Sequence, residues 1–149
     1  MTGDRFLVDT KILVYAYDRT EPTKQIRSRQ ILNWLVTSGS GALSTQVLAE
    51  FFSAVTRRLS EKMSPREGYV RLQEYVRAWR VVSLTPEIIL ESARGAVTHQ
   101  FPFYDAQIWA TAKLSGIPAV LSEDFSHASR IEGVLFLNPF VAALPGEEV

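Results

Sequence analysis

The sequence predicts an α/β protein, a three-layer α/β/α sandwich with a central parallel sheet of about five strands. Two observations support this fold class. Short apolar runs lack the alternation of apolar and polar residues, which indicates strands that are buried on both faces. Longer amphipathic segments separate the runs, as expected for helices that connect neighbouring parallel strands.

The apolar runs that we expect to be strands are bordered by turn-forming residues. Gly39 and Gly41 come before the second run, and Gly116 and Pro118 come before the fourth. The expected strands are Phe6–Val8, Ala42–Leu43, Val81–Leu84, Ala119–Leu121 and Val134–Leu137.

The segments between these runs carry apolar residues at helical spacing, most clearly from Leu48 to Leu59. Ser64–Glu67 is a capping box with proline at the first helical position, so a helix is expected from there to Trp79. The other helices are expected over residues 23–37, 45–60, 85–97 and 103–115.

The composition is that of one globular domain. The chain has 149 residues, of which 46% are hydrophobic and 21% are charged. We expect a domain over residues 1–140 and a short C-terminal tail over 141–149. The absence of cysteine excludes disulfide scaffolds, thiolate zinc sites and cysteine nucleophiles.

Charge and hydropathy narrow the expected setting of the protein. Lys and Arg total 16, as do Asp and Glu, so bulk electrostatics alone would not hold nucleic acid. No apolar run approaches the roughly 20 residues of a membrane span. Residues 1–5 lack the features of a signal peptide, so a cytoplasmic protein without membrane contact is expected.

Two acidic residues follow expected strands. Asp9 comes directly after the first strand, and Asp124 lies shortly beyond Leu121. In an open parallel sheet, sites form outside the carboxyl ends of the strands, so both residues are candidates for a site. The alternative for each is a helix cap or a turn residue.

Two more acidic residues lie on apolar helix faces. Glu50 has the apolar neighbours Val47, Phe51 and Ala54, and Asp105 shares a stripe with the residues that follow it on its helix. An unpaired carboxylate is rarely buried, which suggests a function. The alternatives are a position at the rim for Glu50 and compensation of the helix dipole for Asp105.

If these four acids converge, their mutual repulsion requires a cation. Oxygen ligands in a chain without cysteine favour Mg²⁺ or Mn²⁺ over zinc. Such an ion activates water and stabilises an attacked phosphate, so the acids predict metal-assisted hydrolysis of a phosphoester.

Blocks of the sequence resemble the PIN-domain nucleases, especially the toxins of VapBC-type toxin–antitoxin pairs. The resemblance covers nearly the whole chain, with the blocks in the order and spacing of that family. These blocks are Phe6–Asp18, Leu43–Phe51, Tyr104–Ala112, Leu121–Phe125 and Asn138–Phe140.

The resemblance implies a Mg²⁺-dependent endoribonuclease that hydrolyses RNA. Its acidic quartet at the metal would be Asp9, Glu50, Asp105 and Asp124. Asp9 and Asp105 would be the direct ligands, while Glu50 and Asp124 would hold ligands or metal-bound water, and either could orient the attacking water. The hydroxyl groups of Thr10 and Ser122 would support these ligands. The family also implies a homodimer and a small antitoxin whose C-terminal segment fills the active-site groove.

One position departs from the family pattern. Lys11 stands where the family usually has asparagine, two residues after the first aspartate. Its ammonium group could pair with Asp9 or Asp105, contact substrate phosphate, weaken metal binding, or simply extend into solvent. This departure also raises the second hypothesis, a catalytically silent PIN scaffold that only binds a partner or RNA.

Two further residues have open assignments. Glu123 is the alternative to Asp124 as the fourth acid. Arg57 lies on nearly the same helix face as Glu50 and could bind RNA phosphate, although stabilising the helix C-terminus is its simpler role. A phosphatase or phosphoacceptor domain fits less well, because Lys11 stands where such phosphatases have a second aspartate and Val8 precedes Asp9 where receiver domains have an acidic pair.

Overall fold

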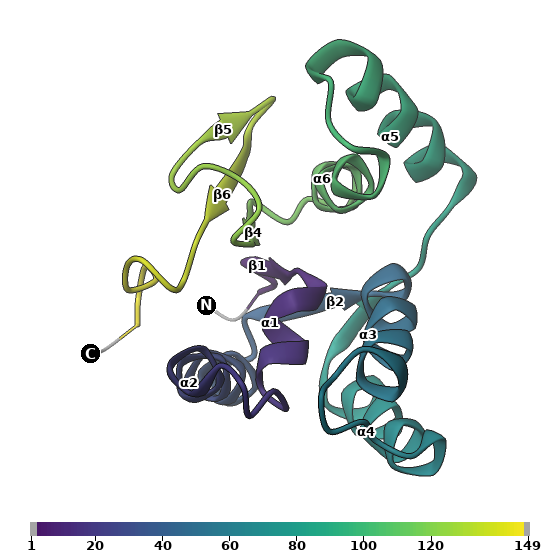
Figure 1. The fold of residues 1–149 in the computed structure, drawn as a ribbon. Helices are drawn as coiled ribbons and strands as arrows, with labels where there is room; N and C mark the ends of the chain where they lie inside the picture. The colour runs from purple at the N-terminus through teal and green to yellow at the C-terminus, as the bar shows by residue number, and fades with distance from the viewer. Residues whose placement is uncertain (1–2, 148–149) are drawn as a thin grey trace.

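The computed structural model describes residues 3–147. It therefore includes all but the first two residues of the expected domain and all but the last two residues of the expected tail. Residues 1–2 and 148–149 lie outside the described part of the chain. Figure 1 shows the elements, which in chain order are β1 (Phe6–Val8), α1 (Thr10–Tyr15), α2 (Pro22–Ser38), β2 (Gly41–Ser44), α3 (Thr45–Arg57), α4 (Pro65–Ala78), β3 (Arg80–Val82), α5 (Pro86–His99), α6 (Phe103–Ser115), β4 (Ala119–Leu121), β5 (Arg130–Ile131) and β6 (Val134–Leu137).

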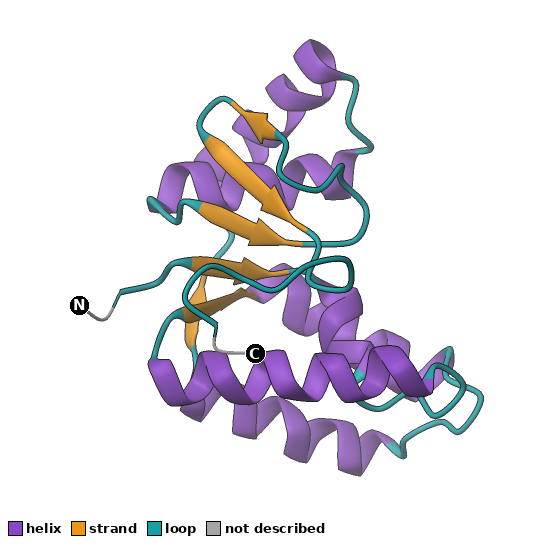
Figure 2. Cartoon of the chain, turned by 90° about the vertical axis from the view of Figure 1, so that its left-hand side faces the viewer, coloured by secondary structure: helices purple, strands orange, loops and turns teal. Residues whose placement is uncertain are grey.

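The strands form a single sheet in the order β3-β2-β1-β4-β6-β5. All pairings are parallel except that between β5 and β6. Helices α1 and α2 lie on one side of the sheet and α5 and α6 on the other, while the α3–α4 pair extends from the edge near β2 (Figures 1 and 2). The predicted α/β sandwich with a parallel sheet is therefore confirmed.

Two elements were not predicted, and both are too short for a periodic pattern. Helix α1 has 6 residues and β5 has 2. The antiparallel β5 is made by a hairpin whose two turn residues, Glu132 and Gly133, both have positive φ, at 48° and 86°. Positive φ at both central positions is typical of the tight turns that match the twist of paired strands. The third strand also begins earlier than expected, at Arg80 rather than Val81.

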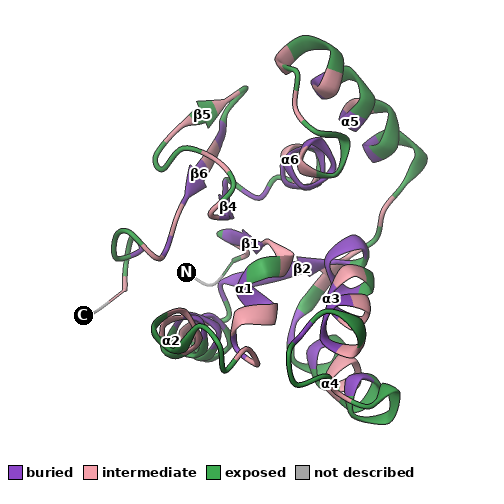
Figure 3. Cartoon of the chain, viewed as in Figure 1, coloured by how far each residue is buried: buried purple, intermediate pink, exposed green. Residues whose placement is uncertain are grey.

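Burial follows the lack of alternation in the sequence. Every residue of β1, β2 and β4 is buried, whereas helices expose their outer faces (Figure 3). Side chains of Ser44, Ser64 and Thr85 cap the first turns of α3, α4 and α5 by accepting hydrogen bonds from backbone N–H groups. The capping box predicted at Ser64 thus marks the true start of α4.

The pair of helices α5 and α6 packs closely around Trp109. A Cβ atom at Gly95 would lie 2.5 Å from the Trp109 ring, so only glycine allows this approach. The indole N–H donates a 3.0 Å hydrogen bond to the carbonyl oxygen of Ile131 in the hairpin. The tryptophan therefore joins both helices to the antiparallel edge of the sheet.

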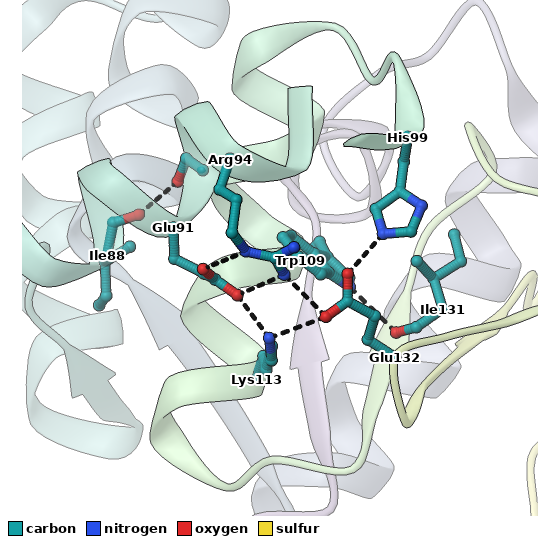
Figure 4. Close-up of polar contacts among 9 residues, drawn as sticks. Ile88, Glu91, Arg94, His99, Trp109, Lys113, Ile131 and Glu132 are labelled. Atoms are coloured by element: carbon teal, nitrogen blue, oxygen red, sulfur yellow. Dashed lines mark hydrogen bonds and ion pairs between the residues drawn. The ribbon is translucent and has the colours of Figure 1, made fainter. Parts of the chain in front are cut away.

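A network of charged side chains covers this junction (Figure 4). Glu91 and Glu132 each contact Arg94 and Lys113, and Glu132 also contacts His99 at 2.6 Å. Hydrogen bonds lower the pKa of both glutamates to about 2, and those from Arg94 have the largest effect. Lys113 contributes at both glutamates, and His99 contributes at Glu132. Because each glutamate of this network already pairs with Arg94 and Lys113, the network connects the hairpin to the helices and its carboxylates are not available to a ligand.

The described part of the C-terminal segment, residues 141–147, packs against α2. Leu144 is buried, and the Arg27 guanidinium donates 2.8 Å and 2.9 Å hydrogen bonds to the carbonyl oxygen of Pro139 and to Glu147. These contacts fix the segment that follows β6. Within residues 3–147, no helix is long and apolar enough to cross a membrane.

Candidate active site

A small acidic cavity opens at the carboxyl end of the central strands. Its volume is about 160 Å³. The loop after β1 and the first turn of α1, helix α3, the N-terminus of α6 and the loop after β4 all contribute to its wall. The lining residues are Asp9, Thr10, Lys11, Gln46, Glu50, Arg58, Tyr104, Asp105 and Asp124. The four acids predicted from separate parts of the sequence thus line one cavity.

Asp9 lies deepest and is held by two donors. One oxygen accepts a 2.8 Å hydrogen bond from the backbone N–H of Thr10, which makes Asp9 the cap of α1. The other oxygen accepts a 2.8 Å hydrogen bond from the hydroxyl of Ser122, at the end of β4. Burial raises the pKa of Asp9 to about 6, against the lowering effect of these two hydrogen bonds. The cap interpretation and the site interpretation therefore both apply to this residue.

Ser122 and Thr10 each connect two parts of the site. The Ser122 hydroxyl donates to Asp9 and accepts a 3.1 Å hydrogen bond from the backbone N–H of Asp124, which positions the loop that carries Asp124. The Thr10 hydroxyl donates a 2.7 Å hydrogen bond to Oε1 of Glu50. Both hydroxyl groups thus donate to carboxylates of the cavity, Ser122 to Asp9 and Thr10 to Glu50.

Gln46 is a site residue that the sequence did not reveal. It lies one helical turn before Glu50 on α3 and is buried. Its amide nitrogen donates to Oε1 of Glu50 at 3.4 Å and to the carbonyl oxygen of Tyr104 at 3.1 Å. Gln46 therefore links α3 to the first turn of α6. The available signal was its spacing of four residues before Glu50, which places both on one helix face.

Asp105 occupies the first turn of α6 and is partly buried. Burial raises its pKa, and the charges of Asp124 and Glu50 raise it further, while the charge of Lys11 lowers it. Asp105 accepts no side-chain hydrogen bond among the interactions of residues 3–147. Its carboxylate is therefore free to bind a group that enters the cavity.

Lys11 pairs with Asp124. The distance from Nζ to Oδ1 is 2.7 Å, and this hydrogen bond raises the pKa of Lys11. The partner is thus neither Asp9 nor Asp105. Glu123 makes its closest contacts elsewhere: its carboxylate contacts Lys24 at 2.8 Å and the hydroxyl of Tyr15, while Lys11 lies farther away, at 4.0 Å. It does not line the cavity, so of the two adjacent acids Asp124 is the one at the site.

The position of the nearby arginines differs from the expectation. Arg58 lines the cavity, whereas Arg57, the residue singled out from the sequence, is exposed in the last turn of α3 and is not part of the wall. The helix ends at Arg57, and Arg58 is its C-cap residue, whose backbone N–H still donates to the carbonyl oxygen of Ala54. Arg58 is therefore the better placed of the two for an anionic substrate.

The donor set suits a hard divalent cation. The cavity offers carboxylate oxygens from four acids and no sulfur or imidazole ligand. Within residues 3–147, no group of three or more acidic or histidine side chains is arranged to hold a metal ion. Asp9 is engaged by its two donors and Asp124 by Lys11. Because Mg²⁺ commonly takes only one or two carboxylates and keeps several waters, the residues present fit such an ion.

A larger cavity of about 360 Å³ lies between α2 and α4. Its wall includes Arg29, Arg71, Tyr75 and Trp79 but no carboxylate. Hydrolysis assisted by a metal ion therefore cannot be assigned to it, and the acidic cavity remains the candidate active site.

Comparison with protein families gives one match, the family described as PIN domain, over residues 6–132. The chain belongs to the PIN domain family. The matched span contains all four acids of the cavity and the elements that carry them, so the site lies within this PIN domain.

Solved structures share the fold. A toxin–antitoxin complex from Klebsiella pneumoniae superposes with a TM-score of 0.65 and 18% identity, covering 89% of this chain and 96% of that chain. A DNA-bound VapBC from Salmonella typhimurium gives 0.63 and 16%, covering 90% and 97%. Mycobacterium tuberculosis VapC20, a toxin that cleaves the sarcin–ricin loop, gives 0.58 and 21%, covering 85% and 97%. A comparison with curated protein sequences gives no match.

The buried Asp9 predicts an unusual pH dependence of stability. A carboxyl group whose pKa rises from 3.8 to about 6 on folding binds its proton more tightly in the folded state. The folded state therefore loses stability as the pH rises from 4 to 6, and the loss persists above that range. In EDTA at pH 8, Asp9→Asn should be more stable than the wild type by about 3 kcal/mol at most, and the two should converge near pH 4.

Urea unfolding at the two pH values measures this difference. The exposed carboxylate of Glu61 provides the control, because Glu61→Gln should show no comparable gain at pH 8. Equal stability of wild type and Asp9→Asn at pH 8 would show that burial does not penalise the ionised Asp9.

Proposed function

We propose that this PIN domain is a metal-dependent endoribonuclease that hydrolyses phosphodiester bonds in RNA. One observation carries the proposal: four acids from distant parts of the chain line a single cavity at the carboxyl end of the sheet. The similarity of the fold to toxins, one of which cleaves the sarcin–ricin loop, supports RNA as the substrate.

Within this proposal each side chain has a role that its surroundings allow. Asp9 and Asp105 hold Mg²⁺ or Mn²⁺, which when bound activates water and stabilises charge on the attacked phosphate. Oε1 of Glu50 accepts the hydrogen bonds from Thr10 and Gln46. Oε2 is therefore available to orient a water molecule. Arg58 at the cavity wall attracts the phosphate backbone.

Removal of either proposed metal ligand should abolish the activity. We expect Asp9→Asn and Asp105→Asn to cleave RNA about 100-fold more slowly or worse than the wild type, and EDTA to have the same effect. After EDTA treatment, addition of Mg²⁺ or Mn²⁺ should restore cleavage by the wild type but not by the two variants. Gel analysis of a labelled RNA measures the rates, with Glu61→Gln as a carboxylate control outside the cavity. Undiminished cleavage by the variants or in EDTA would refute a metal-dependent reaction at this site.

We further propose a toxin role with a small antitoxin as partner. The support is the fold shared with a toxin–antitoxin complex and with VapBC structures. A short reading frame for a DNA-binding protein next to this gene would supply the candidate partner. Its product, co-expressed with this chain, should co-purify with it and suppress RNA cleavage in the assay above. Cleavage that continues at full rate in a complete complex would contradict an antitoxin function.

A homodimer through α5 is proposed on its exposed apolar face. Leu90 and Val97 lie on one side of this helix, and their exposed fractions are 72% and 82%. Large apolar side chains exposed together are typical of an interface. The wild type should therefore have the mass of a dimer by light scattering, and Val97→Glu that of a monomer. The exposed Val141 outside α5 offers a control, because Val141→Glu should leave the mass unchanged.

The second candidate function is a silent PIN domain that only binds a partner or RNA. The ion pair between Lys11 and Asp124 favours it, because that pair engages one of the four acids. The cleavage assay separates the two functions: binding of RNA without cleavage in Mg²⁺ or Mn²⁺ would support the silent domain.

A further inference from the structure

Lys11 is a basic residue within the acidic cavity whose position has a chemical consequence. Its ammonium lies 2.7 Å from Asp124, and its side chain is 54% exposed, so it can be reached from solvent. Lys11 lies in the first turn of α1, directly after Thr10, whose backbone N–H donates to the capping side chain of Asp9. The backbone of Lys11 therefore belongs to a capped helical turn, whereas its ammonium group can exchange partners.

The charges of the cavity wall indicate that Lys11 takes the place of a second divalent cation. Four carboxylates contribute four negative charges, and Lys11 and Arg58 contribute two positive charges. One divalent cation brings the total to zero, whereas a second would leave an excess of positive charge. Unit charges about 4 Å apart interact by about 4 kcal/mol at an effective dielectric of 20, so a lysine at this distance competes strongly with a further cation.

We propose that Lys11 is a built-in cation of this active site, which restricts the cavity to one divalent ion and binds the phosphate of the substrate. This inference rests on the proposed nuclease function and extends it. Lys11 neutralises Asp124, while Asp9 and Asp105 remain for the single ion. When RNA enters, the ammonium group uses its remaining N–H donors for a phosphate oxygen.

The exposed end of Lys11 supports the contact with phosphate. A lysine ammonium has three donors, and the structure assigns one of them to Asp124. Lys11 and Asp105 line the same cavity, and the charge of Lys11 lowers the pKa of Asp105. A phosphate that enters this cavity therefore meets the ammonium group of Lys11.

Titration with Mn²⁺, followed by electron paramagnetic resonance at constant ionic strength, tests the restriction to one ion. We expect the wild type to bind one Mn²⁺ per chain. Lys11→Met and Lys11→Asn should bind the first Mn²⁺ at least tenfold more tightly and should take up a second ion. Lys11→Arg should retain the behaviour of the wild type, because it keeps the charge.

Binding of an RNA oligonucleotide in EDTA tests the contact with phosphate without any cleavage. Lys11→Met should weaken the binding measured by fluorescence anisotropy and reduce the slope of log affinity against log salt by about one. Lys24→Met is the matched control, because Lys24 pairs with the neighbouring Glu123 and does not line the cavity. This control should keep both the metal stoichiometry and the salt slope of the wild type.

The outcomes separate this inference from the proposed function. A wild type that binds Mn²⁺ and cleaves RNA, with unchanged stoichiometry, affinity and salt slope in Lys11→Met, would overturn the role of Lys11 alone. A wild type that binds no Mn²⁺ and cleaves no RNA would overturn the nuclease function itself, together with the inference built on it.

Discussion

The burial of an ionisable carboxylate at the end of the central strand is the constraint on which the site depends. Asp9 lies where β1 ends and α1 begins, so it must leave water while it keeps hydrogen-bond partners. The backbone N–H of Thr10 and the hydroxyl of Ser122 provide those partners, but burial still raises the pKa of Asp9. The fold thus tolerates an energetic cost at this position, as sites that bind ions often do.

The topology of the sheet determines which residues meet Asp9. From β1 the chain continues to β2 and β3 on one side, and it later returns to β4 and β6 on the other side of β1. A crevice forms outside the strand ends where the direction of winding changes. Ser122 and Asp124 follow β4, directly beside Asp9. Glu50 and Asp105 reach the same crevice from helices that begin near this edge.

The helices and loops that form this crevice are connected by the side chains of Thr10, Gln46 and Lys11. Thr10 links α1 to Glu50, Gln46 links α3 to the backbone of α6, and Lys11 links α1 to Asp124. Each contact joins elements that are far apart in the chain. The far edge of the domain uses a different solution, in which the closed network around Glu132 satisfies its charges internally. In the acidic cavity, by contrast, four carboxylates meet only two basic side chains, Lys11 and Arg58.

The sequence by itself determined the fold class, the long helices and the strands with continuous apolar runs. These features depend on local composition and periodicity, which tertiary contacts did not overrule here. The choice between Asp124 and Glu123 stayed open in the sequence, and only the structure places Asp124 on the wall of the cavity. The short α1 and β5 were missed because neither is long enough to show a period, and β5 exists only through its pairing with β6. The choice between Arg57 and Arg58 was also beyond the sequence, because it depends on where α3 ends.

The tertiary structure alone decided the partners of the charged side chains. From sequence, Lys11 could have paired with Asp9, with Asp105 or with water, and only the packing of the β4 loop against α1 places Asp124 next to it. The same packing turns Glu123 towards Lys24, and the docking of α6 against α3 places the carbonyl oxygen of Tyr104 next to Gln46. Charge–charge distances depend on how separate elements dock, and residue order contains that information only through the whole fold.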